Sequence, residues 1–221
     1  MKYVIIFLTF LPAFYIGQMT TDRPGEGTAS DIVAPKTIQL ESGIIYHRSG
    51  KGFTSDHLLR FGLTEKWEVR LQTNQDLSDS SESTYGFSSK YNFLAGEDFE
   101  PSLTLIADSD FHFKNYSFIL ASDKQLTENF GSSLGTGFVK EDDDDFYFLS
   151  FGLDYSLGER WAIFGEYYGY FNSTLSPEHG SDFGITYLTS PRLQLDLSFG
   201  STLLNISDQY FLSTGISYQF R

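Results

Sequence analysis

The stretch SDFGITYLTSPRLQLDLSFG, residues 181–200, alternates large apolar and polar side chains on both sides of a turn-forming Ser-Pro pair. One parity carries Phe183, Ile185, Tyr187, Leu193, Leu195, Leu197 and Phe199. The other parity carries Asp182, Thr186, Gln194, Asp196 and Ser198. A period of two predicts a pair of β-strands whose two faces meet different surroundings.

The same alternation recurs along the chain and predicts an all-β fold. From Thr37 onward, twelve strand-length runs are separated by turn-forming residues. Their predicted limits are 37–46, 57–63, 67–76, 84–93, 102–109, 115–122, 130–139, 146–156, 161–171, 181–189, 193–202 and 209–220.

The connections between these runs fall into two sets. One set is short at 64–66, 157–160 and 189–192, with longer members at 94–101 and 123–129. The other set is more polar and more variable, at 47–56, 77–83, 140–145 and 172–180. Short turns at one end and longer loops at the other are typical of a transmembrane β-barrel with its short turns in the periplasm. We therefore predict a twelve-stranded antiparallel barrel with both chain ends on the periplasmic side.

Charged residues in the predicted strands avoid the parity of the large apolar residues, which carries no charge. The ten that take the opposite parity are Glu41, Arg60, Glu68, Arg70, Lys90, Asp108, Asp154, Glu166, Asp182 and Asp196. This separation predicts lipid outside the barrel and a polar lumen inside.

Export is predicted from the first 17 residues. Lys2 precedes an apolar run from residue 4 to residue 16, which suits a signal peptide and is too short for a membrane-spanning helix. The chain has no cysteine, which excludes a lipid anchor and a disulfide framework. We expect a signal peptide at 1–17, a periplasmic or lumenal leader at 18–36 and an outer-membrane barrel at 37–221.

Both tryptophans begin a predicted strand beside a short turn. Trp67 follows residues 64–66 and Trp161 follows residues 157–160. That height suits an interfacial aromatic girdle, and the alternative is a tryptophan that caps the core of a soluble barrel. Lipid, lipopolysaccharide and the barrel-assembly machinery are the partners that the membrane barrel implies.

The leader is rich in turn-forming and charged residues and shows no strand or helix period. We predict that it enters the lumen from the periplasm and partly fills it, with charges that pair with Arg60, Arg70 and Glu68. The leader residues assigned to this plug are Asp22, Arg23, Pro24, Glu26 and Asp31. The alternative is a disordered tail in the periplasm.

A TDRP element stands at 21–24, Val33 and Pro35 follow it, and Gln39 and Glu41 lie in the first predicted strand. Segments 58–71 and 190–200, with Phe164 and Glu166 between them, complete the pattern. On these residues the chain resembles the outer-membrane family associated with the MetA pathway of phenol degradation. This chain has Ala34 between the valine and the proline, and it ends in Phe220-Arg221. The resemblance implies a barrel that passes small solutes, aromatic or hydrophobic molecules among them.

Other functions find less support in the sequence. A formal charge of -14 argues against a nucleic-acid partner. The four histidines, His47, His57, His112 and His179, lack a nucleophile motif and metal-ligand spacing, so no catalytic residue, cofactor or metal site is predicted. The acidic run 141–145 suits a solvated loop, with binding of Ca²⁺ or of lipopolysaccharide-bridging cations as the alternative. A structural or adhesive barrel with a plugged lumen, and less readily an outer-membrane enzyme, remain as alternatives to a small-solute channel.

Overall fold

The computed structural model describes residues 19–50, 52–78, 83–96, 99–203 and 209–220. The signal peptide expected at 1–17 lies outside these residues. Within them the chain forms twelve strands: β1 (Ile38–His47), β2 (Gly52–Gly62), β3 (Trp67–Asp76), β4 (Thr84–Leu94), β5 (Leu103–Asp110), β6 (Tyr116–Thr127), β7 (Phe130–Glu141), β8 (Asp144–Ser156), β9 (Trp161–Phe171), β10 (Glu178–Ser190), β11 (Leu193–Thr202) and β12 (Tyr210–Phe220).

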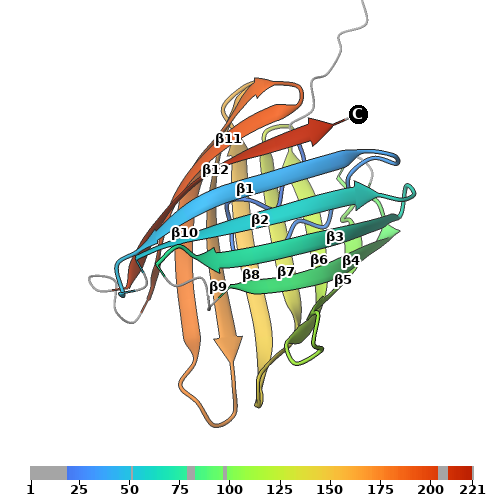
Figure 1. Cartoon of the computed structure of the whole chain (residues 1–221). Coiled ribbons are helices and arrows are strands. Elements are labelled where there is room, and N and C mark those ends of the chain that lie inside the picture. Colours follow the sequence, from blue (N-terminus) through green and yellow to red (C-terminus); the bar gives the residue numbers. More distant parts are fainter. Residues whose placement is uncertain (1–18, 51, 79–82, 97–98, 204–208, 221) are drawn as a thin grey trace, which may run out of the picture.

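The strands close into one antiparallel barrel, as the alternation predicted (Figure 1). Each strand pairs with its neighbours in sequence, and β1 pairs with β12 from Ile38↔Phe220 to His47↔Phe211. Closure leaves no unpaired strand edge, which is the condition that a lipid environment sets for β-structure. In the described part of the chain, no helix has the length and apolar character needed to cross a membrane.

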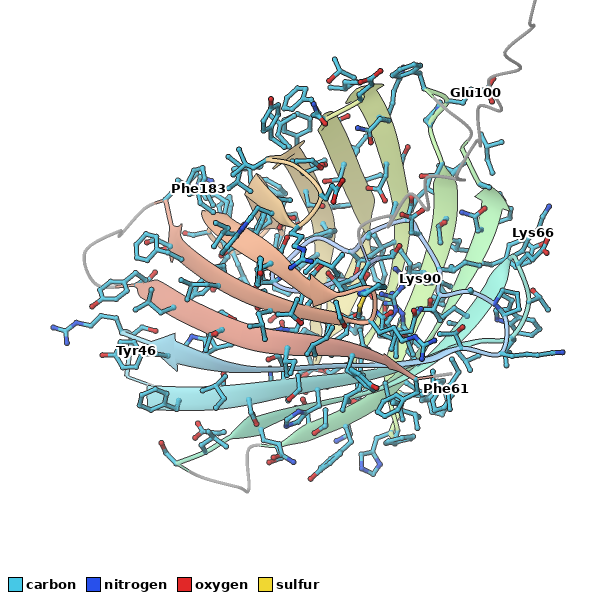
Figure 2. All side chains as sticks on the ribbon, turned by 90° about the horizontal axis from the view of Figure 1, so that it is seen from above. Tyr46, Phe61, Lys66, Lys90, Glu100 and Phe183 are labelled. Carbon is cyan, nitrogen blue, oxygen red and sulfur yellow. The ribbon has the colours of Figure 1, made fainter. Side chains whose placement is uncertain are left out.

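The two faces of the barrel wall have the chemistry that the sequence parity predicted. Phe183 and Leu197 point outward and are 62% and 53% exposed, as side chains that face lipid are in an isolated chain. Asp182 and Lys90 face inward and are 0% exposed. Figure 2 shows Lys90 inside the ring of strands and Phe183 on its outer surface. The wall therefore separates an apolar exterior from a polar lumen.

Trp67 and Trp161 are the first residues of β3 and β9, at the barrel end that carries the short turns. Both side chains are nearly half exposed. The indole N–H of Trp67 donates to Ser89 Oγ at 2.6 Å, and the Trp161 ring lies 4.2 Å from the Tyr187 ring between centroids. Their role as an interfacial girdle stays a prediction.

The predicted loop limits were wrong at both ends of the barrel, because the strands continue farther than the apolar alternation does. At the inner end the connection expected at 123–129 is a turn at 128–129, since β6 runs to Thr127. At the outer end the loop expected at 140–145 is a turn at 142–143, since β7 runs to Glu141 and β8 starts at Asp144. β2 likewise starts at Gly52, inside the loop expected at 47–56. Above the lipid both faces of a hairpin meet water, so polar residues continue the strands. Among the described residues, no group of three or more potential ligands is placed to hold a metal ion.

Candidate functional site

The lumen contains the leader, which crosses the interior of the barrel before β1 begins (Figure 1). Arg23, Ser30 and Val33 are at most 8% exposed there. The leader makes hydrogen bonds to inward-facing side chains of nine strands, namely β1 to β6, β9, β11 and β12. It therefore fills part of the lumen in this structure.

One group of contacts joins the leader to β1–β4 through six ionised side chains, which we call the charge cluster: Asp22, Glu41, Arg60, Glu68, Arg70 and Lys90. Asp22 pairs with Arg70, lies 3.0 Å from Lys90 Nζ and lies 3.9 Å from Arg60 Nη1. Arg60 also pairs with Glu41 at 2.8 Å and with Glu68 at 2.9 Å. The cluster holds three cations and three carboxylates, so its formal charges balance.

Asp22 of the leader supplies the third carboxylate, which balances the three cations. Burial alone would raise the pKa of its carboxyl, but the charges of Arg70, Lys90 and Arg60 hold that pKa well below its usual range. Backbone groups of the leader add to the attachment. Val33 N–H donates to Glu68 at 2.7 Å, and Arg60 donates to the carbonyl of Thr20 at 3.1 Å.

Arg23 forms a second attachment, to side chains of β2, β11 and β12. Its guanidinium pairs with Asp56, and it donates to Asp196 at 3.1 Å and to Ser213 at 2.8 Å. Burial alone would lower the pKa of Arg23, but the carboxylates of Asp196 and Asp56 raise it above its ordinary value.

Two glycines make room for that guanidinium. Gly43 of β1 and Gly215 of β12 face each other across the strand pair. A Cβ atom at either position would collide with the Arg23 guanidinium. The missing side chains therefore form the recess in which Arg23 lies.

The far side of the leader has fewer contacts. Gly27 N–H donates to Glu166 Oε1 of β9 at 2.7 Å, and Ser30 donates to Asp123 of β6 at 2.6 Å from its N–H. Enclosure by the barrel wall raises the pKa of the neighbouring Glu26 carboxyl, and the charge of Asp56 raises it further. Enclosure within the barrel and the charge of Asp123 likewise raise the pKa of the Asp31 carboxyl.

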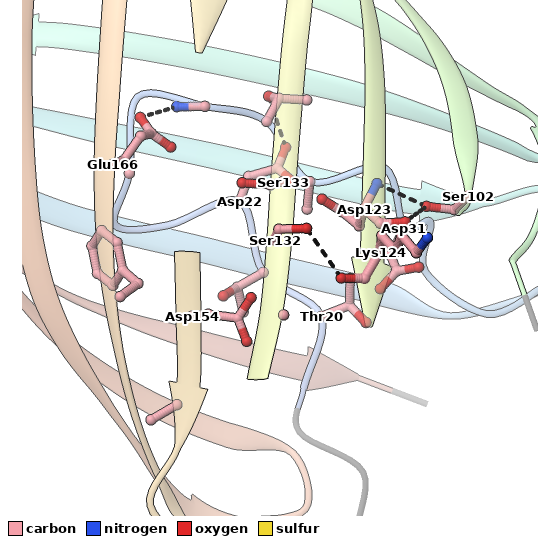
Figure 3. Close-up of a pocket in the computed structure, with 18 of the residues that line it drawn as sticks. Thr20, Asp22, Asp31, Ser102, Asp123, Lys124, Ser132, Ser133, Asp154 and Glu166 are labelled. Atoms are coloured by element: carbon pink, nitrogen blue, oxygen red, sulfur yellow. Dashed lines mark hydrogen bonds between the residues drawn. The ribbon is translucent and has the colours of Figure 1, made fainter. Parts of the chain in front are cut away.

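Two cavities lie on either side of the leader, and Asp22, Arg23, Gly25, Gly27 and Thr28 line both. The inner cavity, of about 410 Å³, lies toward the short turns. Figure 3 shows part of its lining, with Asp154 and Glu166 of the barrel wall and Asp22 and Asp31 of the leader. The outer cavity, of about 670 Å³, is lined by carboxylates that include Glu26, Asp56, Asp108 and Glu141.

The structure places the ten charged residues predicted for the lumen in different surroundings: at the leader, on one of the two cavities, or away from both. Glu41, Arg60, Glu68, Arg70, Lys90 and Asp196 contact the leader or its partners. Asp108 lines the outer cavity, and Asp154 and Glu166 line the inner one. Asp182 is buried between strands and lines neither.

Sequence reasoning missed two lumenal carboxylates, Asp56 and Asp123, because each lies one residue beyond a predicted strand limit. Both have the inward parity of their strands, which an extension of 57–63 and of 115–122 by one residue would have revealed. Both contact the leader.

A serine–histidine pair on the outward face was also missed. Ser42 Oγ lies 2.8 Å from His57 Nδ1. Nucleophilic catalysis takes a third group that orients the base. Among the described residues no third group contacts the His57 ring. The pair therefore has a hydroxyl beside a base, without the group that would orient the base.

Comparisons with solved structures agree on the architecture. KdgM porin matches with a TM-score of 0.66 at 13% identity, covering 83% of this chain and 99% of that chain. NanC porin matches with a TM-score of 0.63 at 9% identity, covering 81% and 98%. Omp33 of Acinetobacter baumannii matches with a TM-score of 0.53 at 11% identity, covering 84% and 98%. At these identities the likeness shows the fold, which is that of an outer-membrane barrel.

A search of curated proteins finds no significant match. One family model matches residues 21–220, from the TDRP element to the last strand, and its description reads "Putative MetA-pathway of phenol degradation". The match spans the leader as well as the barrel, so the two occur together in the family pattern. The chain belongs to this family of outer-membrane β-barrel proteins.

Proposed function

We propose that the protein is an outer-membrane channel for small solutes, that its lumen favours cations, and that the leader narrows it. The observation that carries this proposal is the pair of cavities on the two sides of the leader. A barrel filled by its own side chains, as the smallest barrels are, would leave no such space.

The preference for cations follows from the carboxylates that have no cationic partner. Within the described residues, the carboxylates around the lumen that make no ion pair include Glu26, Asp31, Asp108, Asp123, Asp154, Glu166 and Asp182. The lumenal arginines and Lys90 are already paired with carboxylates. A narrow polar passage with surplus negative charge concentrates cations and repels anions.

This electrostatic argument separates the protein from one of its structural relatives. KdgM porin has been solved in complex with disordered oligogalacturonate, which is an acidic oligosaccharide. The unpaired carboxylates of the present lumen oppose such a polyanion. We therefore propose small neutral or cationic solutes, and aromatic ones among them, because Phe164 and Tyr170 line the two cavities.

Planar-bilayer recordings of the full mature chain test this function. In a KCl gradient, the reversal potential should show a higher permeability for K⁺ than for Cl⁻. Liposome-swelling rates should fall in the order cationic, neutral, acidic for solutes of equal size. A wild-type barrel that passes no current, while a variant without residues 20–35 does, would instead support the plugged structural barrel.

A further inference from the structure

Asp182 is the lumenal carboxylate whose surroundings the channel does not explain. It lies in the middle of β10, opposite Glu166 on β9 and Gly200 on β11. Its side chain is 0% exposed, and neither carboxylate oxygen has a hydrogen-bond partner among the described residues. A buried carboxylate without a partner is costly, so this group favours the approach of a hydrogen-bond donor.

Aromatic rings surround this carboxylate because its neighbours in the sheet are glycines. Gly180 and Gly184 flank Asp182 along β10, and Gly200 faces it across the ladder. A Cβ at these three positions would collide with the side chains of Tyr168, Phe164 and Phe211 respectively. The three rings therefore occupy the places that glycine leaves open around Asp182, and we call them the aromatic box.

Glu166 connects the box to the inner cavity. It is the cross-strand neighbour of Asp182 and lines that cavity, as does Phe164. No lysine or arginine of the described residues pairs with either carboxylate. Two carboxylates thus lie side by side on β9 and β10, one beside the aromatic box and one on the inner cavity, and neither has a cation from the described part of the chain.

We propose that Asp182, Glu166 and the aromatic box bind a small organic cation that carries a primary ammonium group. An ammonium group offers three N–H donors, which suits the unpartnered oxygens of Asp182 and the carboxylate of Glu166. Ring faces attract a cation further and accept its alkyl groups. The site rests on the proposed function in one respect, since its ligand arrives through the inner cavity, where rotation of the Phe164 ring opens the box.

Calorimetric titration of the full mature chain in detergent tests the site without any need for conduction. The probe is n-butylammonium, and tetramethylammonium, which has the charge but no N–H donor, is its matched comparison. Wild-type protein should bind n-butylammonium at one site and tetramethylammonium at least about tenfold more weakly, as expected for lost charge-assisted hydrogen bonds.

Variants locate the binding. Asp182→Asn and Glu166→Gln should each weaken n-butylammonium binding about tenfold or more, and Phe164→Leu should weaken it less. Glu159→Gln removes a carboxylate from the turn at 157–160, outside the box and outside the cavity lining, and should leave the affinity within about twofold. Heat-dependent gel migration confirms that each variant forms a barrel, and Glu166→Gln carries the test if Asp182→Asn does not fold.

Equal affinity in wild type and in the Asp182 and Glu166 variants, or equal binding of the two probes, would overturn the site. Binding by a protein that passes no current would leave the site standing and contradict the channel. Conduction by a protein that does not bind n-butylammonium would support the channel and contradict the site.

Discussion

The two sides of the lumen meet the leader in different ways. On the β1–β4 side, the charge cluster holds the leader through ion pairs and through bonds to its backbone. On the β7–β9 side, Gly131, Ser133, Ser150 and Gly152 present small side chains or none, and the inner cavity lies against this wall. Charge therefore fixes the leader to one wall, and the small residues leave room for the inner cavity along the other.

The charge cluster positions the leader more than it stabilises the barrel. Ion pairs taken out of water recover little net free energy, but loss of one partner leaves a buried charge and is costly. Because Asp22 supplies one of the three carboxylates, the cluster is balanced only with the leader in place. If charge holds the leader to the β1–β4 side, variants of the two walls should differ in their effects, which range from large to small.

The largest effect is expected for Asp22→Asn. It leaves Arg60, Arg70 and Lys90 with two carboxylates, which should cost the seated leader about 3–5 kcal/mol. Proteolysis of the leader by a non-specific protease, followed by mass spectrometry, should become much faster, and conductance should rise. Asp31→Asn is the matched control, since the Asp31 carboxyl makes no ion pair among the described residues. Equal protease sensitivity in the two variants would contradict the role of the cluster.

A smaller effect is expected for Gly43→Ala. Its Cβ would collide with the Arg23 guanidinium, so Arg23 must leave Asp196 or the strand must shift, at a cost of about 1–3 kcal/mol. Gly152→Ala on the opposite wall is the control, because its Cβ would meet the Ser133 hydroxyl, which can rotate away. Denaturant titrations and leader proteolysis compare the two. If both alanines are tolerated alike, the recess around Arg23 is unimportant.

Ion selectivity should change moderately when the open wall loses charge. Asp154→Asn removes a carboxylate from the inner cavity and should lower the K⁺/Cl⁻ permeability ratio about two- to fivefold. Glu159→Gln in the neighbouring turn at 157–160 lies outside the cavity lining and serves as control. Reversal potentials measure both, and an unchanged ratio for Asp154→Asn would place the selective step elsewhere.

The smallest effect is that of pH on the leader. The pKa of Glu26 is raised by enclosure and by Asp56, so the folded state holds this proton more tightly than a released leader does. Seating is therefore strongest below the ordinary carboxyl pKa of about 4.3 and weakens as pH rises through the raised value. Asp22, whose pKa is lowered, stays ionised over this window. Leader proteolysis should be somewhat faster at pH about 8 than at about 5, and Glu26→Gln should remove part of that difference.

The barrel itself could be predicted from the sequence because lipid and water impose opposite demands on alternate residues. Phe183 and Asp182 are neighbours in the chain yet point to opposite faces of the barrel wall, so parity alone assigns both strand and face. The same signal disappears where strands leave the lipid. Glu141 and Asp144 are polar strand residues in water, and their strands were therefore drawn too short.

The lumen was less predictable because its contacts join residues far apart in sequence. Composition indicated that the leader carries charges, but nothing local pairs Arg23 with Asp196, 173 residues away. The register that places Gly43 opposite Gly215 exists only once β1 and β12 close the barrel. Such contacts form only when the strands close into a barrel, and the sequence of one strand carries no information about them.

The central claim, that charge holds the leader to one wall and leaves the other open, is tested most directly by thiol accessibility. The chain has no cysteine, so Ser133→Cys on the open wall and Ser217→Cys on β12, where Ser217 is 0% exposed, each carry a single reporter. During bilayer recording, a small water-soluble thiol reagent should react at position 133 and reduce the current. Position 217 should react only after Asp22→Asn or leader deletion. Equal reaction at both positions in the otherwise wild-type protein, or at neither, would contradict the account.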